Sequence, residues 1–199
     1  MTCGIVLAAG LSSRMGRPKA LLKHVPSGRT FVGHLVRSAR QAGVAAVLVV
    51  GRPADDRLRL AAEGEGATFV GNPRAQEGQL SSLLAGLDAA AGNPDVDAVL
   101  VMPVDLALVS TAVIGRLLDR AAQSDAVILR AVHGGRHGHP VLFKRPVFEE
   151  LRRADPALGA RGVVRSDPAR VEDVEVGDPG ATVDIDTPAD YERAFGRKL

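Results

Sequence analysis

The chain has 199 residues, of which 46% are apolar and 24% are charged. These fractions are typical of a globular domain and exclude a disordered chain, so we expect one domain over residues 1–199. The 25 basic and 23 acidic residues nearly cancel, which argues against binding to a nucleic-acid backbone. Aromatic residues make up only 3% of the chain, too few for base-stacking platforms. The single cysteine, Cys3, excludes an internal disulfide and a cysteine zinc site.

The first apolar run has no basic segment before it and reaches only Gly10, unlike a secretory signal. No other stretch approaches the roughly 20 apolar residues of a membrane helix. We therefore expect a soluble cytoplasmic protein that contacts no membrane. Cys3 lies in this apolar run and is expected to be a buried strand residue rather than a reactive thiol.

Seven short runs rich in apolar and β-branched residues predict strands. Most are continuous rather than alternating, as in strands that are buried on both faces of a sheet. In chain order these runs are Gly4–Ala9, Ala45–Val50, Ala67–Val70, Ala98–Met102, Ala126–Ala131, His139–Phe143 and Arg170–Val176.

Helical spacing of apolar residues separates several of these runs. Thr30 is expected to cap one helix, Ser110 or Thr111 another, and Thr187 a short final helix. A further helix contains Leu80, Leu83, Leu84 and Leu87. The segment Arg152–Pro168 has weak periodicity and is expected to form a helix and a loop over one end of the sheet.

The alternation of strands and helices predicts an α/β fold with three layers around a doubly wound, mostly parallel sheet of Rossmann-like type. The run His139–Phe143 follows the preceding strand after a Gly-rich link that is too short for a parallel crossover. We therefore expect this one strand to be antiparallel. Ligands of such sheets bind at the carboxyl ends of the strands, so the residues that follow each strand are the candidates for function.

A Gly-rich basic loop, Leu7–Lys19, follows the first strand directly. Its small residues let a ligand approach the backbone, whose N–H groups bind phosphate. Arg14 and Lys19 add positive charge. The loop matches neither the Walker nor the dinucleotide-binding pattern, and the alternative is an ordinary surface loop. The small residues are Ala8, Ala9 and Gly10.

Acidic residues stand at two further places. Asp105 ends a buried strand, where it could hold Mg²⁺ together with phosphate oxygens; a plain turn residue is the alternative. Asp184 and Asp186 are two residues apart, so in extended backbone both carboxylates point to one side. Two like charges on one face repel unless a cation lies between them. An alternative role for the Asp186 carboxylate is to stabilise the N-terminus of the following helix.

A loop around residues 132–141 carries His133, His137 and His139. It has no cysteine or acid to complete a zinc site, so a flexible substrate-binding turn is the favoured interpretation. Arg136 in this loop could meet a phosphate of an acceptor substrate. His24 and His34 belong to no pattern and are expected on the surface or in a helix.

The segment Leu7–Lys19 resembles the signature L-A-A-G-x-S-x-R-M-G-x-x-K of the nucleotidyltransferases of the molybdenum-cofactor type. The resemblance extends over nearly the whole chain and implies the nucleotide-diphosphosugar transferase-like fold. It also implies nucleotide contacts by Leu7 and the three small residues, and phosphate binding and catalysis by Arg14 and Lys19. Asp105 is the third catalytic candidate.

Three further segments of the sequence resemble elements of this family. The first, Gly71–Gly86, implies nucleoside contacts by Asn72, Gly78 and Ser82, although Ala75 stands where an aromatic residue is common. The second, Gly138–Phe143, implies an acceptor contact by His139. The third, Val183–Asp190, together with Asp105, implies a Mg²⁺ site. Its ligands would be Asp105, Asp184 and Asp186, although Ala107 replaces the usual proline after Asp105.

The sequence Leu7-Ala-Ala-Gly10 resembles the cytidylyltransferase branch, whereas the guanylyltransferase branch reads L-A-G-G. The resemblance therefore implies transfer of a nucleotide from CTP to molybdopterin cofactor with release of pyrophosphate. GTP remains open as the donor, as do sugar-phosphate, methylerythritol-phosphate and phosphoenolpyruvate-type acceptors. A non-catalytic accessory protein of a molybdoenzyme and a dinucleotide-binding oxidoreductase are the rival classes. A molybdoenzyme partner and self-association are both left open.

Overall fold

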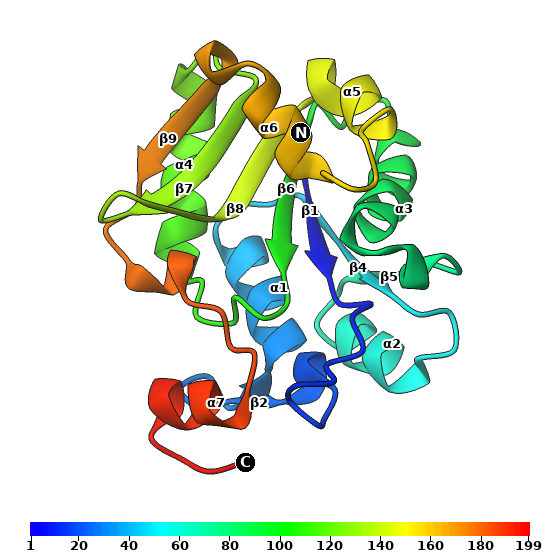
Figure 1. Ribbon diagram of the computed structural model, residues 1–199, viewed down its shortest axis with the longest axis vertical. Helices are drawn as coiled ribbons and strands as arrows, with labels where there is room; N and C mark the ends of the chain where they lie inside the picture. Colours follow the sequence, from blue (N-terminus) through cyan, green and yellow to red (C-terminus); the bar gives the residue numbers. More distant parts are fainter.

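The computed structural model describes all 199 residues, and seven of its strands form one sheet (Figure 1). The strand order is β5-β4-β1-β6-β8-β7-β9. Strand β8 is antiparallel to β6 and β7, and all other neighbours are parallel. The predicted mostly parallel sheet with one antiparallel strand is therefore confirmed. The strands are β1 (Thr2–Leu7), β4 (Ala46–Gly51), β5 (Thr68–Gly71), β6 (Ala98–Pro103), β7 (Ile128–His133), β8 (Arg136–Lys144) and β9 (Val171–Glu175).

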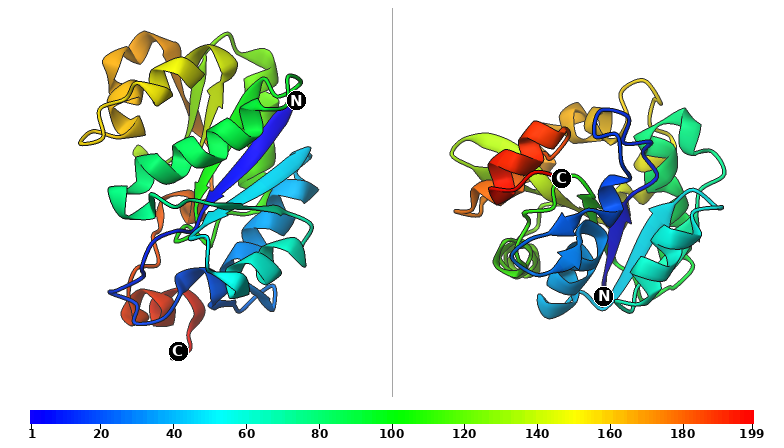
Figure 2. Two further views of the ribbon diagram at one scale, coloured as in Figure 1. Left: turned by 90° about the vertical axis from the view of Figure 1, so that its right-hand side faces the viewer. Right: turned by 90° about the horizontal axis from the view of Figure 1, so that it is seen from below.

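Helices cover both faces of the sheet, which gives the three predicted layers (Figure 2). Helices α1, α2 and α4 pack on one face and α3, α5 and α6 on the other, each over its own apolar cluster. Helix α7 lies beyond the carboxyl edge, beside a small hairpin of β2 (Lys23–His24) and β3 (Arg29–Thr30). The helices are α1 (Phe31–Gln41), α2 (Asp56–Glu63), α3 (Gln79–Ala91), α4 (Thr111–Gln123), α5 (Phe148–Arg152), α6 (Ala160–Ser166) and α7 (Pro188–Phe195).

The helix starts follow the predicted caps. Thr30 accepts a hydrogen bond from Gly33 N, and Ser110 accepts one from Val113 N. Thr187 and Asp190 form a reciprocal capping box at the start of α7. These side chains satisfy amide groups that have no partner within the first helical turn.

Two local features differ from the sequence-based expectations. Helix α2 has no counterpart among the predicted helices, because Leu58 and Ala62 are its only buried residues and give no clear apolar period. His24 was expected on the surface or in a helix, but it is buried in strand β2 and stacks on His34 with ring centroids 3.7 Å apart. The surface alternative is therefore wrong for His24. Cys3 is buried in β1, as predicted.

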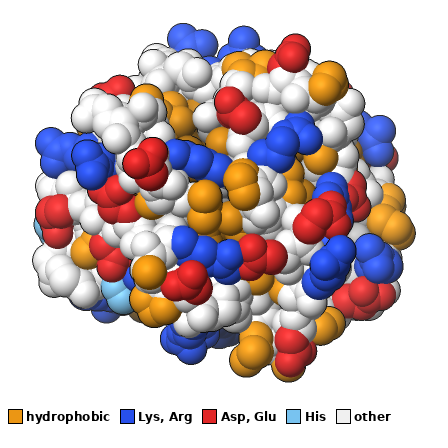
Figure 3. All heavy atoms as spheres, turned by 90° about the horizontal axis from the view of Figure 1, so that it is seen from above, with side chains coloured by type: hydrophobic (Ala, Val, Ile, Leu, Met, Phe, Trp, Pro, Cys, Tyr) orange, Lys and Arg blue, Asp and Glu red, His pale blue; other side chains and the backbone are white.

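The carboxyl ends of β1 and β6 lie side by side and place two loops together. Val104 N donates to Leu7 O over 3.1 Å, and Ile185 N donates to Asp105 O over 2.9 Å. The second bond ties the segment before α7 to the end of β6. On the opposite edge of the molecule, acidic and basic side chains are interspersed with apolar ones (Figure 3). No helix is long and apolar enough to cross a membrane.

Candidate active site

The loop after β1 is shaped by its own backbone. Met15 N and Gly16 N both donate to Ser12 O, over 3.0 and 3.1 Å, and Ser12 itself has a positive φ of 53°. Met15 is buried and anchors the loop in the core. The amides from Ala9 to Arg14 donate to no backbone carbonyl, so they are free to bind the oxygens of an anion.

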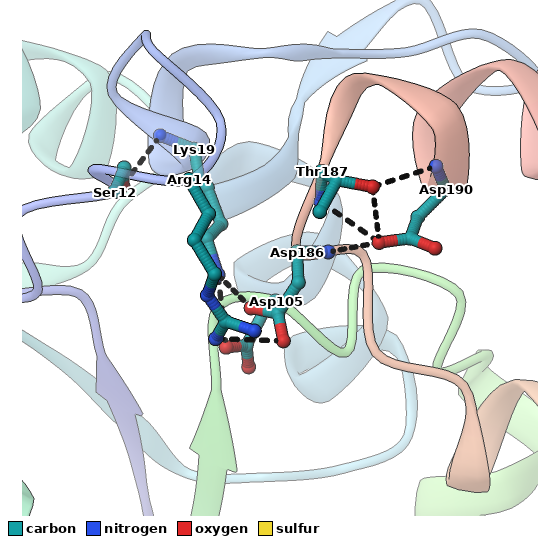
Figure 4. A network of polar contacts seen from close by, with 7 residues as sticks. All are labelled: Ser12, Arg14, Lys19, Asp105, Asp186, Thr187 and Asp190. Atoms are coloured by element: carbon teal, nitrogen blue, oxygen red, sulfur yellow. Dashed lines mark hydrogen bonds and ion pairs between the residues drawn. The ribbon is translucent and has the colours of Figure 1, made fainter.

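Lys19 lies at the end of this loop and joins two carboxylates (Figure 4). Its Nζ is 2.5 Å from Asp186 Oδ1 and 3.3 Å from Asp105 Oδ2. Arg14 Nη2 is 2.9 Å from Asp186 Oδ2, on the solvent side of the cluster. Lys19 is almost fully buried, whereas the Arg14 side chain is 69% exposed. The fold thus brings four of the predicted catalytic and metal-binding residues into one ion-pair network.

Asp184 completes the acidic group without entering this network. Ile185, between the two aspartates, is fully buried, so Asp184 and Asp186 extend to the same side of the segment as predicted. The pKa of Asp184 is raised by desolvation and then by the negative charges of Asp105 and Asp186. The three carboxylates therefore repel one another in part, although Lys19 lies among them.

The donor chemistry of this cluster fits a divalent cation. Carboxylate oxygens are the ligands that Mg²⁺ prefers, and Lys19 contacts two of the carboxylates here, Asp105 and Asp186. No group of three or more metal-ligating side chains converges in the structure. A cation here would accordingly use one or two carboxylates and complete its coordination with phosphate oxygens and water. Asp105 and Asp186 are the best placed to hold it.

A cleft of about 380 Å³ adjoins this cluster, and most of the predicted nucleotide-binding residues line it. Asn72 is the exception. It is 1% exposed, and its Nδ2 donates to Ser81 Oγ and Ser82 Oγ over 3.0 and 3.1 Å. Asn72 therefore positions Ser82 rather than the ligand. The predicted residues that line the cleft are Leu7, Ala8, Ala9, Gly10, Arg14, Lys19, Gly78, Ser82 and Asp105.

The same cleft contains Ser12, Asp55 and Gln79, which sequence reasoning missed. Asp55 caps α2, and its Oδ1 accepts from Leu58 N over 3.0 Å. Each has the appearance of a turn or capping residue in the sequence. Only the meeting of the loops at one edge shows that they face the cleft.

A second, larger cleft of about 730 Å³ shares Leu7 and Gln79 with the first and extends between the sheet and α6. His139 lines it, as expected for an acceptor contact. Burial lowers the pKa of His139 to about 4, an effect that Asp105 opposes and Arg161 reinforces. Its imidazole is therefore neutral at pH 7. Arg136 lines neither cleft; it is exposed, and its Nη2 is 3.5 Å from Thr182 O.

The loop with unpaired amides and the acidic cluster both lie at the carboxyl edge of a mostly parallel sheet, where such folds bind their ligands. This is an α/β protein of the Rossmann-like nucleotidyltransferase fold. The chain belongs to the MobA-like NTP transferase domain family, which it matches over residues 4–173.

Two curated relatives are similar to the chain. It is 39% identical over 116 residues to a molybdenum cofactor guanylyltransferase of Xanthomonas euvesicatoria, covering 58% of this chain and 52% of that protein. The chain thus spans about half the length of that relative. It is 26% identical over 190 residues to the molybdenum cofactor cytidylyltransferase of Escherichia coli, covering 94% and 92% of the two chains.

Among solved structures, the fold is similar to that of Rv0371c from Mycobacterium tuberculosis. The TM-score is 0.82 at 28% identity, with 98% of both chains covered. A second structure of Rv0371c is described as a complex with manganese and gives a TM-score of 0.76 at 29% identity, again with 98% of both chains covered.

Proposed function

We propose that this protein transfers a nucleoside monophosphate from a nucleoside triphosphate to a phosphate-bearing acceptor and releases pyrophosphate. The observation that carries the proposal is the network of Arg14, Lys19, Asp105 and Asp186 beside the loop of free amides. A triphosphate in the cleft would meet the loop amides, the two cations and the carboxylates that pair with them. This arrangement suits a reaction in which negative charge moves along the phosphate chain.

In this reaction an acceptor phosphate oxygen attacks the α-phosphorus, and the bond from that phosphorus to the β-phosphate bridge oxygen breaks. The loop amides, Arg14 and Lys19 bind the β- and γ-phosphates and stabilise the charge of the departing pyrophosphate. A phosphomonoester has a second pKa near 6, so the acceptor is already mostly a dianion at pH 7 and needs no general base. Positioning and electrostatics therefore supply the catalysis.

Asp105 and Asp186 would hold a Mg²⁺ ion, which would neutralise charge on the phosphate oxygens. The Rv0371c complex with manganese is consistent with a divalent cation in a related fold. Lys19 has to give up at least one of its two carboxylate contacts when such an ion binds, and the phosphates of the nucleotide are its alternative partners.

For the substrates we propose CTP and molybdopterin cofactor. The support is the sequence Leu7–Gly10 and the similarity to the cytidylyltransferase over 94% of the chain. The methyl group of Ala9 also favours CTP over GTP, because it narrows the cleft at the position where the guanylyltransferase signature has glycine. The network would act in the same way with GTP as the donor or with another phosphorylated acceptor.

The decisive experiment measures pyrophosphate release from CTP, Mg²⁺ and molybdopterin cofactor by wild type and Asp105→Asn. We expect the variant to lose at least about 100-fold in rate, because it loses a charge at the reacting centre. Asp119→Asn is the matched control, since Asp119 is an exposed residue of α4 and forms no ion pair. If wild type binds CTP and releases no pyrophosphate, the accessory-protein alternative is favoured.

A thermal-shift panel of CTP, GTP, ATP and UTP with Mg²⁺ tests the base. A ligand at 100 times its dissociation constant stabilises a protein by about 2.7 kcal/mol, which is easily measured. We expect the largest shift with CTP. A larger shift with GTP would contradict the cytidylyl assignment and leave the reaction class standing.

A further inference from the structure

The larger cleft carries positive charge that no residue of the protein balances. Arg161 and Arg165 of α6 both line it, and neither guanidinium takes part in an ion pair or a side-chain hydrogen bond. Two neighbouring arginines are paired, because Arg152 contacts Asp88 and Arg170 contacts Glu150. Arg161 and Arg165 instead face one cleft without an acidic partner.

The spacing on α6 directs these side chains to one face. Arg161, Val164 and Arg165 are three and four residues apart, and all three line the cleft. The opposite wall has no net charge to offset them, because Arg130 binds Asp173 through two nitrogens, over 2.8 and 3.1 Å. His137 Nε2 is also 3.2 Å from Asp173 Oδ2.

The inner part of the cleft is apolar. Leu80 and Leu83 of α3 meet Val101, Val141 and Phe143 of the sheet there. At about 730 Å³ the cleft is within the range of small-molecule sites. Its lining suits a ligand with an apolar body and an anionic group.

Arg161 shares its cleft with His139 and with Leu7, which also lines the nucleotide cleft. An anion held by Arg161 would thus lie in a cleft that adjoins the nucleotide cleft. Arg165, one helical turn further along, would contact the same anion from the outer side.

We infer that Arg161 and Arg165 form the clamp that holds the phosphate of an acceptor whose body is apolar. The inference rests on the proposed function for the identity of this cleft as the acceptor subsite. It replaces Arg136, which lines neither cleft, as the arginine that contacts the acceptor.

The test uses 1-naphthyl phosphate as a probe, since it combines a flat apolar ring with a dianionic phosphate. Binding is followed by calorimetry at pH 7.5 for wild type, Arg161→Gln and Arg165→Gln. Each substitution should weaken binding about tenfold, because each removes a charge-assisted hydrogen bond. 1-Naphthol, which lacks the phosphate, should bind weakly and with the same affinity to all three proteins.

Arg153→Gln is the matched control, because Arg153 is exposed, forms no ion pair and lies outside the cleft. It should bind the probe as wild type does. Equal affinity of wild type and Arg161→Gln would overturn the inference. A loss with Arg14→Gln in place of Arg161→Gln would also overturn it, because the probe would then occupy the nucleotide loop.

CTP binding with Mg²⁺ is measured on the same samples. Wild type that binds CTP and not the naphthyl probe would refute the clamp and leave the proposed function intact. Wild type that binds the probe through Arg161 and fails to bind any nucleoside triphosphate would refute the proposed function and, with it, the assignment of the clamp to an acceptor.

Discussion

Lys19 and Asp186 are 167 residues apart in the sequence and form an ion pair, with Nζ 2.5 Å from Oδ1. The same ammonium group contacts Asp105 at the end of β6. One buried lysine thus holds together the phosphate loop, the central sheet and the segment before α7. Its ammonium group lies between the two carboxylates that a cation would share.

Lys19→Met should therefore have opposite effects on metal and nucleotide. Without the ammonium group, Asp105 and Asp186 should bind Mn²⁺ about tenfold more tightly in nucleotide-free protein, because a competing positive charge is gone. CTP binding should weaken by at least about tenfold, because a phosphate ligand is lost. Calorimetric titration of Mn²⁺ and of CTP measures both effects.

Lys23→Met is the control for this prediction, because Lys23 is exposed and its side chain forms no ion pair. It should bind both ligands as wild type does. Weaker Mn²⁺ binding in Lys19→Met would show that Lys19 supports the metal site rather than competing with it.

All four members of this network could be predicted from the sequence. Arg14, Lys19 and Asp105 each follow a strand or lie in a recognisable motif, and Asp186 belongs to the acidic pair before the last helix, so these residues were predicted. Their pairing pattern was not, since nothing local shows that Asp186 contacts Lys19 and Arg14 while Asp184 contacts neither. Arg161 and Arg165 were missed altogether, because a short helix with weak periodicity gives no signal of the cleft that it covers.

Ala9→Gly should shift the preference among nucleotides. The Ala9 side chain is nearly buried and lines the nucleotide cleft, so removing its methyl group enlarges the space there. One methyl group in a pocket is worth roughly tenfold in discrimination. We expect the GTP-to-CTP ratio of dissociation constants to fall by about that factor. Ala45→Gly, at an exposed position just before β4, should leave the ratio unchanged, and an equal shift in both variants would contradict the role of Ala9.

Gly86 shows how closely α3 packs on the sheet. A Cβ added there would lie 2.6 Å from Ile5 Cγ2 and 3.0 Å from Val50 Cγ2. Gly86→Ala should thus force α3 outward and lower the free energy of unfolding by about 1–3 kcal/mol. Because α3 carries Ser82, the KM for CTP should rise as well.

Gly115→Ala in α4 is the comparison, because nothing lies within 4 Å of the added Cβ. It should raise the free energy of unfolding by up to about 1 kcal/mol, since alanine is the better helix former. Urea unfolding measures both changes. Changes of the same sign in the free energy of unfolding for the two substitutions would contradict the close packing at Gly86.

The sheet and the capped helices could be predicted because their causes are local. Continuous β-branched runs identify buried strands, and the short Gly-rich link before β8 makes a parallel crossover impossible. The burial of His24 has a different origin. Its strand has only two residues, and it becomes enclosed because α1 and α7 close over it with His34 and Phe195 against its ring. Such long-range enclosure leaves no period in the sequence.

The buried His24 should make folding sensitive to mild acid. Burial lowers its pKa to about 4, and His34 contributes to the shift, while Ser27 N donates to Nδ1 and favours the neutral ring. The unfolded chain has a pKa near 6.5 at this residue and takes up a proton first, so stability is full above pH 7 and is lost between pH 6.5 and 4. About 2 kcal/mol should disappear between pH 7 and pH 5. Urea unfolding of His24→Gln should show a pH slope that is flatter by this amount, and equal slopes in the two proteins would refute the assignment.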